Sequence, residues 1–215
     1  MDKNIDMIVF DLFGTLIKFG TRRHPYRTIM NWAREHGRRP QPNDARTIMT
    51  TNGPPELVFQ RLGINPPNRL LRQFESDIAY ELNSLALFDD VVPTLTGLSK
   101  AGLQLAVCSN LAKPYGESAD KLLREFDVLR CFSFEVGSIK PEPYIYNWLL
   151  ESTGLTKQSI LFIGDNTVTD YEGPLSFGFL AYLLKRDSTP EADRLSSLIE
   201  LKTKVSLDPT KSDCD

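Results

Sequence analysis

Basic residues are not in excess in this chain, and cysteine is scarce. The 25 lysines and arginines are outnumbered by 28 aspartates and glutamates, which gives a formal net charge of -3. Nucleic-acid-binding faces need clustered positive charge, so we expect no nucleic acid partner. The three cysteines, Cys108, Cys131 and Cys214, are too few and too widely spaced for a disulfide framework or a paired metal motif. This cysteine usage fits a reducing cytoplasm.

A long hydrophobic run is also missing. The first residues, MDKNIDMIVFDLFG, place acidic residues on both sides of a very short apolar segment, which is unlike a secretory signal. No run approaches the roughly 20 apolar residues that a membrane-spanning helix requires. We therefore expect a soluble, cytoplasmic protein without a membrane partner.

Four short apolar runs have the composition of strands that are buried on both faces. They are Met7 to Phe10, Leu103 to Cys108, Leu161 to Ile163 and Phe179 to Leu184. Helical patterns that end at Gly102, Gly154 and Gly178 lie between them. The alternation predicts an α/β fold with a doubly wound, Rossmann-like parallel sheet, whose ligand sites lie beyond the carboxyl ends of the strands.

Residues 19–87 interrupt this alternation with helical patterns and no strand between them. One helix is expected between Pro25 and Gly37, a second over Pro55 to Leu62, and a third carries an apolar stripe from Leu71 to Leu85. We expect a small helical-bundle cap, inserted into a core domain of residues 1–18 and 88–200. After a short helix near residues 192–201, the polar residues 201–215 are expected to form a flexible tail.

Polar residues follow each predicted strand, beginning with Asp11. In IVFDLFGTLI an apolar strand ends at Asp11, and Gly14 and Thr15 turn the chain directly afterwards. A carboxylate at this position faces the ligand crevice and can attack an electrophile to form a covalent ester or acyl phosphate. The same residue could merely end a strand and cap a turn, so this motif alone leaves both interpretations open.

Two further motifs supply groups that suit an anionic ligand. Ser109 and Asn110 end the strand in LQLAVCSN, where a hydroxyl and an amide can hold an oxyanion. Lys140, in VGSIKPEPYIY, precedes a helix that starts with proline, so its ammonium group can offset the charge of nucleophile and substrate. Each motif has an ordinary alternative, because Ser-Asn often starts a loop and a lysine before a helix is common on surfaces.

The fourth motif, ILFIGDNTVTDYEG, contains two aspartates. A strand ends at Gly164 and Asp165, and Asp170 follows about one helical turn later. Two carboxylates at this spacing suit a hard divalent cation such as Mg²⁺, which takes oxygen ligands. A capped turn in which Asp170 solvates the start of a helix explains the motif equally well.

Together, the order and spacing of these four motifs resemble the haloacid dehalogenase superfamily over roughly residues 7–184, and the helical insert matches the cap of many members. The resemblance implies a hydrolase of the same fold, with Asp11 as nucleophile and Ser109 and Lys140 steadying the transferred group. The implied phosphate-binding residues are Gly14, Thr15, Ser109, Asn110 and Lys140. The implied Mg²⁺ ligands are Asp11, Asp165, Asp170 and the backbone carbonyl of Phe13.

Phe13 departs from the pattern of the phosphatases. Members that hydrolyse phosphate esters usually carry a second aspartate there, which protonates the leaving group and then activates water. A phenyl ring can do neither, and losing a positioned acid-base group typically costs about 10²- to 10⁴-fold in rate. Dehalogenating members have an aromatic residue at this position and expel halide, but they work without metal and lack the carboxylate that Asp165 provides.

The metal motif outweighs the aromatic residue, so we expect a Mg²⁺-dependent hydrolase of a small phosphorylated metabolite, slowed unless another group supplies the proton. Two alternatives stay open. One is a 2-haloacid dehalogenase in which Arg38 or Arg39 binds the substrate carboxylate. The other is a catalytically impaired protein that binds a ligand or partner. The expected assembly is a monomer or homodimer, and the cap residues that could contact substrate are Arg22, Arg23, His24 and Arg27.

Overall fold

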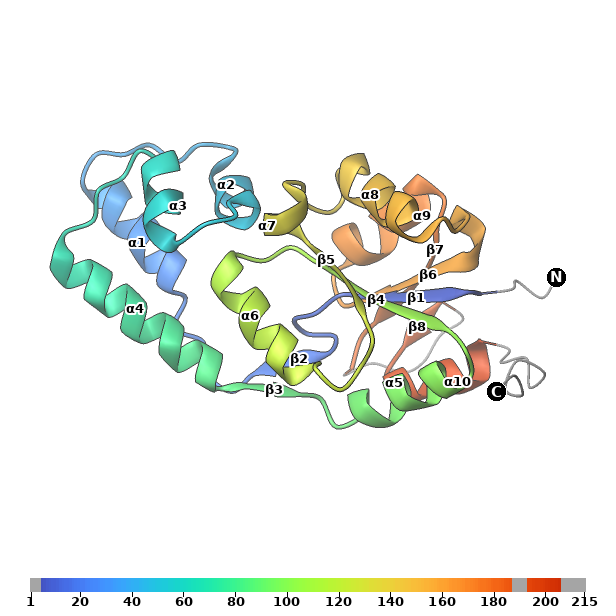
Figure 1. Cartoon of the computed structure of the whole chain (residues 1–215). Helices are drawn as coiled ribbons and strands as arrows, with labels where there is room; N and C mark the ends of the chain where they lie inside the picture. Colours follow the sequence, from blue (N-terminus) through green and yellow to red (C-terminus); the bar gives the residue numbers. More distant parts are fainter. Residues whose placement is uncertain (1–4, 187–192, 206–215) are drawn as a thin grey trace.

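A six-stranded parallel sheet forms the centre of the molecule (Figure 1). The computed structural model describes residues 5–186 and 193–205. The strand order is β5-β4-β1-β6-β7-β8, and every neighbouring pair is parallel. The strands are β1 (Met7–Phe10), β4 (Gln104–Ser109), β5 (Leu129–Phe132), β6 (Ile160–Gly164), β7 (Leu180–Leu184) and β8 (Arg194–Leu195). This topology confirms the predicted α/β fold with a doubly wound parallel sheet.

Helices cover both faces of the sheet, as Figure 1 shows. One face is covered by α5 (Val91–Lys100), α6 (Lys113–Leu122) and α10 (Leu201–Lys204), and the other by α8 (Pro143–Thr153) and α9 (Gly173–Phe177). Strand β1 is buried between the two layers. Ile8 and Phe10 pack in one apolar core while Met7 and Val9 pack in the other, because successive side chains of a strand point to opposite faces.

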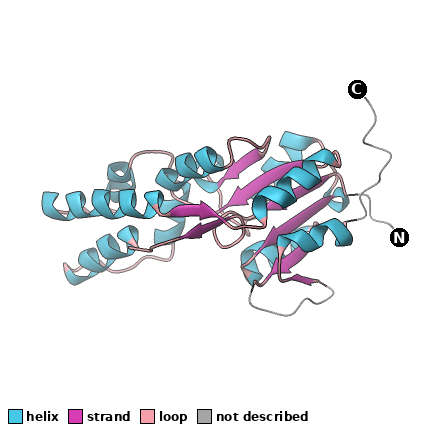
Figure 2. Ribbon diagram, turned by 90° about the horizontal axis from the view of Figure 1, so that it is seen from below, coloured by secondary structure: helices cyan, strands magenta, loops and turns pink. Residues whose placement is uncertain are grey.

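Four helices gather away from the sheet (Figure 2). They are α1 (Pro25–Glu35), α2 (Asp44–Thr50), α3 (Pro55–Arg61) and α4 (Asn68–Asn83). Ile29, Phe59, Phe74 and Ile78 belong to an apolar cluster that these helices build among themselves. We call α1 to α4 the cap helices. Their division from the core at residues 19 and 87 remains a prediction.

A short antiparallel ribbon connects the cap helices to the sheet, where no strand was expected. Strands β2 (Ile17–Phe19) and β3 (Leu85–Leu87) pair, with Phe19 opposite Leu85. The predicted third helix therefore ends before Leu85, which belongs to β3. The three-residue spacing from Leu82 to Leu85 fits a helix stripe, so hydrophobic periodicity alone could not reveal this boundary.

The end of the described chain also differs from expectation. Residues 198–204 form a 3-10 turn, η3 (Leu198–Glu200), and then α10, so the expected helix starts later than residue 192, which lies outside the described residues. Leu201 and Val205 are both buried in the core of the sheet. The core therefore reaches residue 205, beyond the expected boundary at 200, and residues 206–215 lie outside the described part of the chain.

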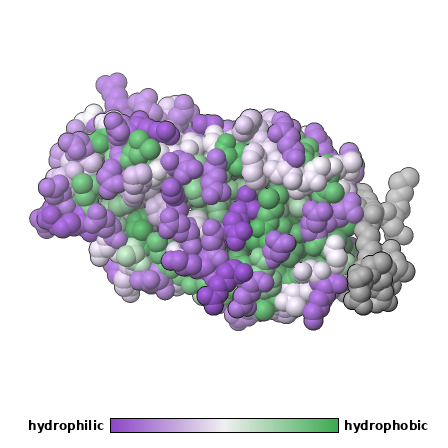
Figure 3. Space-filling model, in the orientation of Figure 1, coloured by the Kyte–Doolittle hydropathy of each residue, from purple (hydrophilic) through white to green (hydrophobic). Residues whose placement is uncertain are grey.

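Several short elements complete the fold. The 3-10 turn η1 (Lys157–Ser159) precedes β6, the π-helical η2 (Thr167–Glu172) follows it, and α7 (Ser133–Val136) follows β5. On the face seen in Figure 3, hydrophobic residues form small separated areas among hydrophilic ones. Within residues 5–186 and 193–205, no helix combines the length and apolar character needed to cross a membrane.

Candidate active site

Three of the polar side chains expected at the site follow neighbouring strands. Asp11 comes directly after β1, Ser109 ends β4, and Asp165 comes directly after β6. Because β1 lies between β4 and β6, parallel pairing brings the three strand ends to one edge of the sheet. The Asp11 N-H continues this pairing by donating to the Ile163 carbonyl at 2.8 Å.

Lys140 joins the first and fourth motifs. Its ammonium nitrogen lies 2.8 Å from Asp11 Oδ1 and 2.7 Å from Asp170 Oδ1. The lysine residue is only 2% exposed, so it is not the surface lysine that commonly precedes a helix. Ser109 Oγ donates to the same Asp11 oxygen at 3.2 Å. One oxygen of Asp11 is thus held by a cation and a hydroxyl.

The three aspartates form a compact group of oxygen donors. Ligand atoms of Asp11, Asp165 and Asp170 lie within 4.8 Å of one another. With all groups ionised, the three carboxylates outnumber the ammonium groups beside them, which are Lys140 and, at Asp165, Lys185. A hard divalent cation with oxygen ligands would neutralise this excess, so the donor set fits Mg²⁺. Asp165 is partly exposed whereas Asp11 and Asp170 are buried, so the group opens to solvent on the Asp165 side.

The pKa values reflect this crowding of charge. Burial raises the pKa of Asp11 to about 6, although the adjacent Lys140 opposes the shift. Burial and the nearby Asp170 also raise the pKa of Asp165. For Lys140, burial alone would lower the pKa, but Asp11 and Asp170 overcome that effect and hold it well above its usual range. The lysine therefore stays charged at neutral pH, and the carboxylates gain from any added cation.

Two glycines leave room for the carboxylates. Gly14 has φ +90, and a Cβ atom there would overlap the Asp165 carboxylate. A Cβ atom on Gly164 would overlap the Asp170 side chain in the same way. The turn after β1 and the end of β6 can therefore approach the acidic group only without side chains, which is one of the established uses of glycine.

Asn110 and Thr15, which were also expected to bind phosphate, make other contacts in the structure. Both ends of the Asn110 side chain are occupied by the Lys140 backbone, since Nδ2 donates to the carbonyl at 2.9 Å and Oδ1 accepts from the N-H at 2.7 Å. Asn110 thus positions Lys140. Thr15 is fully buried, and its carbonyl accepts from Arg186.

Sequence analysis missed residues that hold Asp170 and Asp165. Thr169 Oγ1 and the Asn166 N-H donate to the two oxygens of Asp170, at 3.0 Å each. Asn166 also caps η2, because its side chain accepts from the N-H groups of Val168 and Thr169. Lys185 donates to the Asp165 carbonyl. An asparagine just before a helix is a recognisable N-cap signal, so Asn166 was identifiable from sequence.

Phe13 lies in a cluster of rings beside Asp11. Its ring centroid is 4.7 Å from that of Phe19, at the end of β2, and 5.8 Å from that of Tyr115, on α6. The Phe19 and Tyr115 rings are 6.1 Å apart. We call these three side chains the aromatic wall. Phe13 thus brings an aromatic ring to the position where phosphatases of the resembled family usually carry a carboxylate.

The arginines expected to contact a substrate have three different surroundings. Arg22 and Arg27 line a cavity of about 280 Å³ next to the aromatic wall, together with His24. Arg23 lies over the Tyr80 ring instead. Arg38 makes a two-pronged ion pair with Asp44, at 2.5 and 2.8 Å, and also donates to the Leu62 carbonyl. Its guanidinium is therefore committed within the cap.

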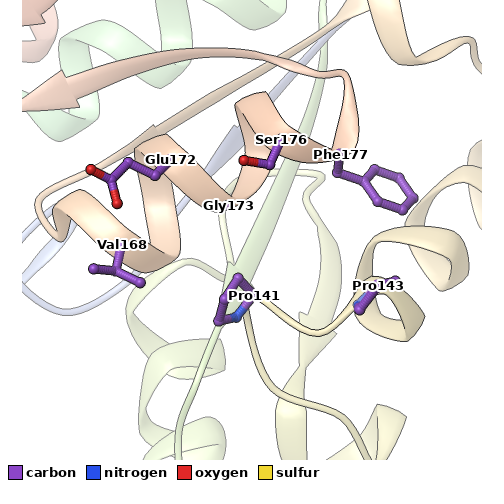
Figure 4. Close-up of a pocket in the computed structure, with 7 residues that line it drawn as sticks. All are labelled: Pro141, Pro143, Val168, Glu172, Gly173, Ser176 and Phe177. Atoms are coloured by element: carbon purple, nitrogen blue, oxygen red, sulfur yellow. The ribbon is translucent and has the colours of Figure 1, made fainter.

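A second cavity, of about 340 Å³, lies beside the loop that follows Lys140 (Figure 4). Prolines 141 and 143 and Phe177 form much of its lining, and Glu172 and Ser176 provide its polar side chains. None of the seven lining residues carries a positive charge. This cavity does not suit a phosphate group, whereas the Lys140 ammonium beside Asp11 provides the positive charge that such a group needs.

Comparison of the sequence with known proteins identifies a family and several relatives. A family model described as haloacid dehalogenase-like hydrolase matches residues 8–179. Haloacid dehalogenase-like hydrolase domain-containing protein 3 of Danio rerio is 29% identical over 163 residues, which are 69% of this chain and 65% of the relative. Glyceraldehyde 3-phosphate phosphatase of Methanopyrus kandleri is 28% identical over 136 residues, 61% of this chain and 58% of the relative. The matches thus span less than two thirds of these relatives.

Solved structures share the fold at low identity. A HAD family enzyme of Bacteroides thetaiotaomicron, in complex with magnesium and inorganic phosphate, superposes with a TM-score of 0.64 at 16% identity, over 86% of this chain and 96% of the other. A 2-haloacid dehalogenase of Pseudomonas syringae gives 0.60 at 18% identity, over 94% and 97%. Because proteins with different names match about equally well, the fold alone does not separate their reactions.

Proposed function

The chain belongs to the haloacid dehalogenase-like hydrolase family, and we propose that it is a Mg²⁺-dependent phosphatase with Asp11 as its covalent nucleophile. The observation that carries this proposal is the group formed by Asp11, Asp165 and Asp170 around Lys140. An excess of buried carboxylates beside a fixed ammonium suits a reaction in which a cation and a phosphate dianion both enter. The phosphatase named among the relatives adds support at the family level.

In the proposed reaction, a carboxylate oxygen of Asp11 attacks phosphorus while the bond from phosphorus to the leaving oxygen breaks. The resulting aspartyl phosphate is then attacked at phosphorus by water, which releases inorganic phosphate and the free carboxylate. Lys140 and Ser109 already contact Asp11 Oδ1 and would steady the transferred group. Bound Mg²⁺, held by Asp11, Asp165, Asp170 and the Phe13 carbonyl, would supply charge neutralisation.

Dehalogenation is the main competing activity within the family. Of the two arginines expected to bind a substrate carboxylate in that reaction, Arg38 is paired with Asp44 inside the cap and Arg39 is exposed. The acidic group also has no role in a metal-independent reaction. We therefore rank phosphate ester hydrolysis above halide release.

The direct test is hydrolysis of 4-nitrophenyl phosphate with Mg²⁺ and with a chelator. We expect turnover that depends on Mg²⁺ and falls at least about 10⁴-fold in Asp11→Asn, since that variant lacks the attacking oxygen. Asp89→Asn is the matched control, because the Asp89 side chain is fully exposed on the surface. It should retain the wild-type rate.

Two other outcomes would redirect the assignment. Release of halide from a 2-haloacid in the presence of chelator would replace the phosphatase with a dehalogenase. Binding of phosphate or Mg²⁺ without turnover, and without beryllium fluoride trapping on Asp11, would identify a binding protein that retains the scaffold of the family.

A further inference from the structure

The aromatic wall removes acid-base chemistry from one side of Asp11. Phe13 is two residues beyond the nucleophile, and its ring packs against Phe19 and Tyr115. None of these rings carries a carboxyl or imidazole group. The groups that line the far side of Phe19 and Tyr115 are the next candidates for contact with a leaving group.

A cavity of about 280 Å³ lies between the start of α1 and helix α6, and it is joined to the site through Phe19 and Tyr115, whose rings contact Phe13. Phe19 and Tyr115 form its inner side, and Arg22, His24, Tyr26 and Arg27 line it from the cap. Its volume is close to the lower end of ligand pockets, about 300 Å³. We call it the leaving-group pocket.

Glu81 provides the only carboxylate among the described residues that line this pocket, and both of its oxygens already accept hydrogen bonds. Glu81 is 3% exposed; one of its oxygens accepts from the N-H groups of Arg23 and His24, and the other accepts from the Tyr115 hydroxyl. Burial, together with Glu81, raises the pKa of Tyr115 above its usual range. Burial raises the pKa of Tyr26 as well. Neither tyrosine is therefore an effective proton donor at neutral pH.

Positive charges outnumber negative ones in the leaving-group pocket, since Arg22 and Arg27 face the single carboxylate of Glu81. Arg22 and Arg27 are exposed, and in the described chain neither makes an ion pair. The Arg22 guanidinium lies 4.3 Å from the centre of the Phe19 ring, so cation and aromatic face are presented together. The buried Tyr26 hydroxyl has no hydrogen-bond partner among the described residues. These groups suit a flat body that carries an anion.

We propose that the leaving-group pocket selects phosphate monoesters whose leaving group is a conjugated oxyanion bearing a second negative charge, as in carboxylated aryl or enol phosphates. The proposal rests on the phosphatase function above. When Asp11 bonds to phosphorus, the electron pair of the broken bond stays on the leaving oxygen. Conjugation stabilises that oxyanion, which leaves unprotonated and takes a proton from solvent later. Conjugation thus removes the need for an acid at position 13 in the first step, while water attacks the aspartyl phosphate in the second step without a side-chain base at that position.

The first experiment compares four carboxylated or neutral esters on the wild-type protein with Mg²⁺. We expect kcat/KM for 4-carboxyphenyl phosphate to exceed that for phenyl phosphate by about ten- to hundredfold, as for a hydrogen bond to a charged group. Phosphoenolpyruvate should likewise be accepted. Phosphoglycolate carries a carboxylate but leaves as an alkoxide, so it should be at least about 10²-fold slower.

Variants separate the pocket from the rest of the cap. Arg22→Ala and Arg27→Ala should each lower the preference for the carboxylated aryl ester. Arg34→Ala is the matched control, because Arg34 is an exposed arginine in the last turn of α1. Equal preference in all three variants would overturn the pocket assignment.

A leaving-group series tests the proton argument. For neutral para-substituted aryl phosphates, kcat/KM should fall steeply as the leaving phenol becomes more basic. A flat dependence in the wild type that becomes steep in His24→Gln would show that His24 protonates the leaving group, and would overturn the proposal. If no ester is hydrolysed, the phosphatase assignment has failed. Saturable binding of 4-hydroxybenzoate that is weakened in Arg22→Ala would then still support the pocket assignment. Absence of such binding would overturn the pocket assignment as well.

Discussion

Gly14 shows how much of the site depends on a missing side chain. Its backbone has φ +90, and the space where a Cβ atom would be is filled by the Asp165 carboxylate. Gly37 has the same φ of +90 but nothing within 4 Å of an added Cβ. The two positions therefore share the backbone strain of a substitution and differ only in the overlap.

We expect Gly14→Ala to abolish Mg²⁺-dependent turnover, because Asp165 must move away from Asp11. Gly37→Ala should cost only the left-handed strain, about 1–2 kcal/mol of unfolding free energy, and should keep its activity. Steady-state kinetics and urea unfolding of both variants provide the comparison. Equal activity in the two would mean that Asp165 is not needed where the structure places it.

At the scale of elements, an ion pair joins helix α2 to the loop that carries Lys140. Arg46 Nε and Nη2 lie 2.7 and 3.0 Å from the two oxygens of Glu142, and Nη2 also donates to the Gly137 carbonyl. Ser133 Oγ makes a neighbouring contact by donating to the Met49 carbonyl at 2.7 Å. The cap is thus fastened close to Lys140, which lies two residues before Glu142.

The strength of this ion pair should depend on pH. Hydrogen bonding to Arg46 lowers the pKa of Glu142 to about 2 from an ordinary value of 4.5. A lowered pKa in the folded state gives stability that is fully present above pH 4.5 and is lost as the pH falls toward 2. The Arg46 side chain is 41% exposed and the Glu142 side chain 34%. Because solvent screens the attraction between exposed charges, we expect a coupling free energy of only about 0.5–1 kcal/mol.

A double-mutant cycle with Arg46→Ala and Glu142→Gln, measured by urea unfolding at pH 7 and pH 3.5, tests this expectation. The coupling free energy should be smaller at pH 3.5. A coupling that is zero at pH 7, or the same at both pH values, would show that the ion pair does not hold the cap.

Sequence patterns identified the long elements better than the short ones. Buried strands such as β1 and β6 are continuous apolar runs, and α1 and α8 have clear apolar stripes, so hydrophobic periodicity located them. Strand β5 has the sequence LRCF, and α6 contains both a proline and a glycine, so neither has a strong local pattern. They form because neighbours already in place bury their few apolar side chains.

Sequence patterns also predicted only part of the candidate site. The identities of Asp11 and Asp165 were readable because each follows a strand, and that of Lys140 because it precedes a helix that starts with proline. Contacts between distant segments could not be predicted from local patterns. Examples are the hydrogen bonds from Asn110 to the Lys140 backbone. The aromatic wall is another example. Arg38 looked available for a ligand because its partner Asp44 could not be known.

The last described helix offers a test of where the core ends. Leu201 is fully buried, while Ile199, two residues earlier, is 50% exposed. Leu201→Ala should lower the free energy of unfolding by about 2–5 kcal/mol, as for other buried leucines. Ile199→Ala should change it by less than about 0.5 kcal/mol. Similar small losses in both would mean that α10 does not belong to the core in solution.

For the whole molecule, the acidic group predicts that Mg²⁺ stabilises the folded state. Unfolding separates Asp11, Asp165 and Asp170, so only the folded chain can bind the ion with all three. At a Mg²⁺ concentration about 100 times the dissociation constant, the free energy of unfolding should rise by about 2.7 kcal/mol. Thermal unfolding with increasing Mg²⁺ measures this shift.

The control for this prediction is Asp127→Asn, at an exposed aspartate on the opposite end of β5 from the site. It should show the full Mg²⁺ shift, whereas Asp165→Asn should lose most of it. An equal response of both variants would indicate general salt effects and no specific ion site.

The β2-β3 ribbon has a consequence for how this chain could be shortened or recombined. The Gly20 N-H donates to the Ser84 carbonyl at 3.0 Å, so the chain departs toward the cap helices and returns at adjacent points. A tight turn could bridge those points with little entropic penalty for closure. Replacing residues 21–83 by such a turn would keep the pairing of β2 with β3 and remove the contacts of Arg46 with Glu142 and of Glu81 with Tyr115.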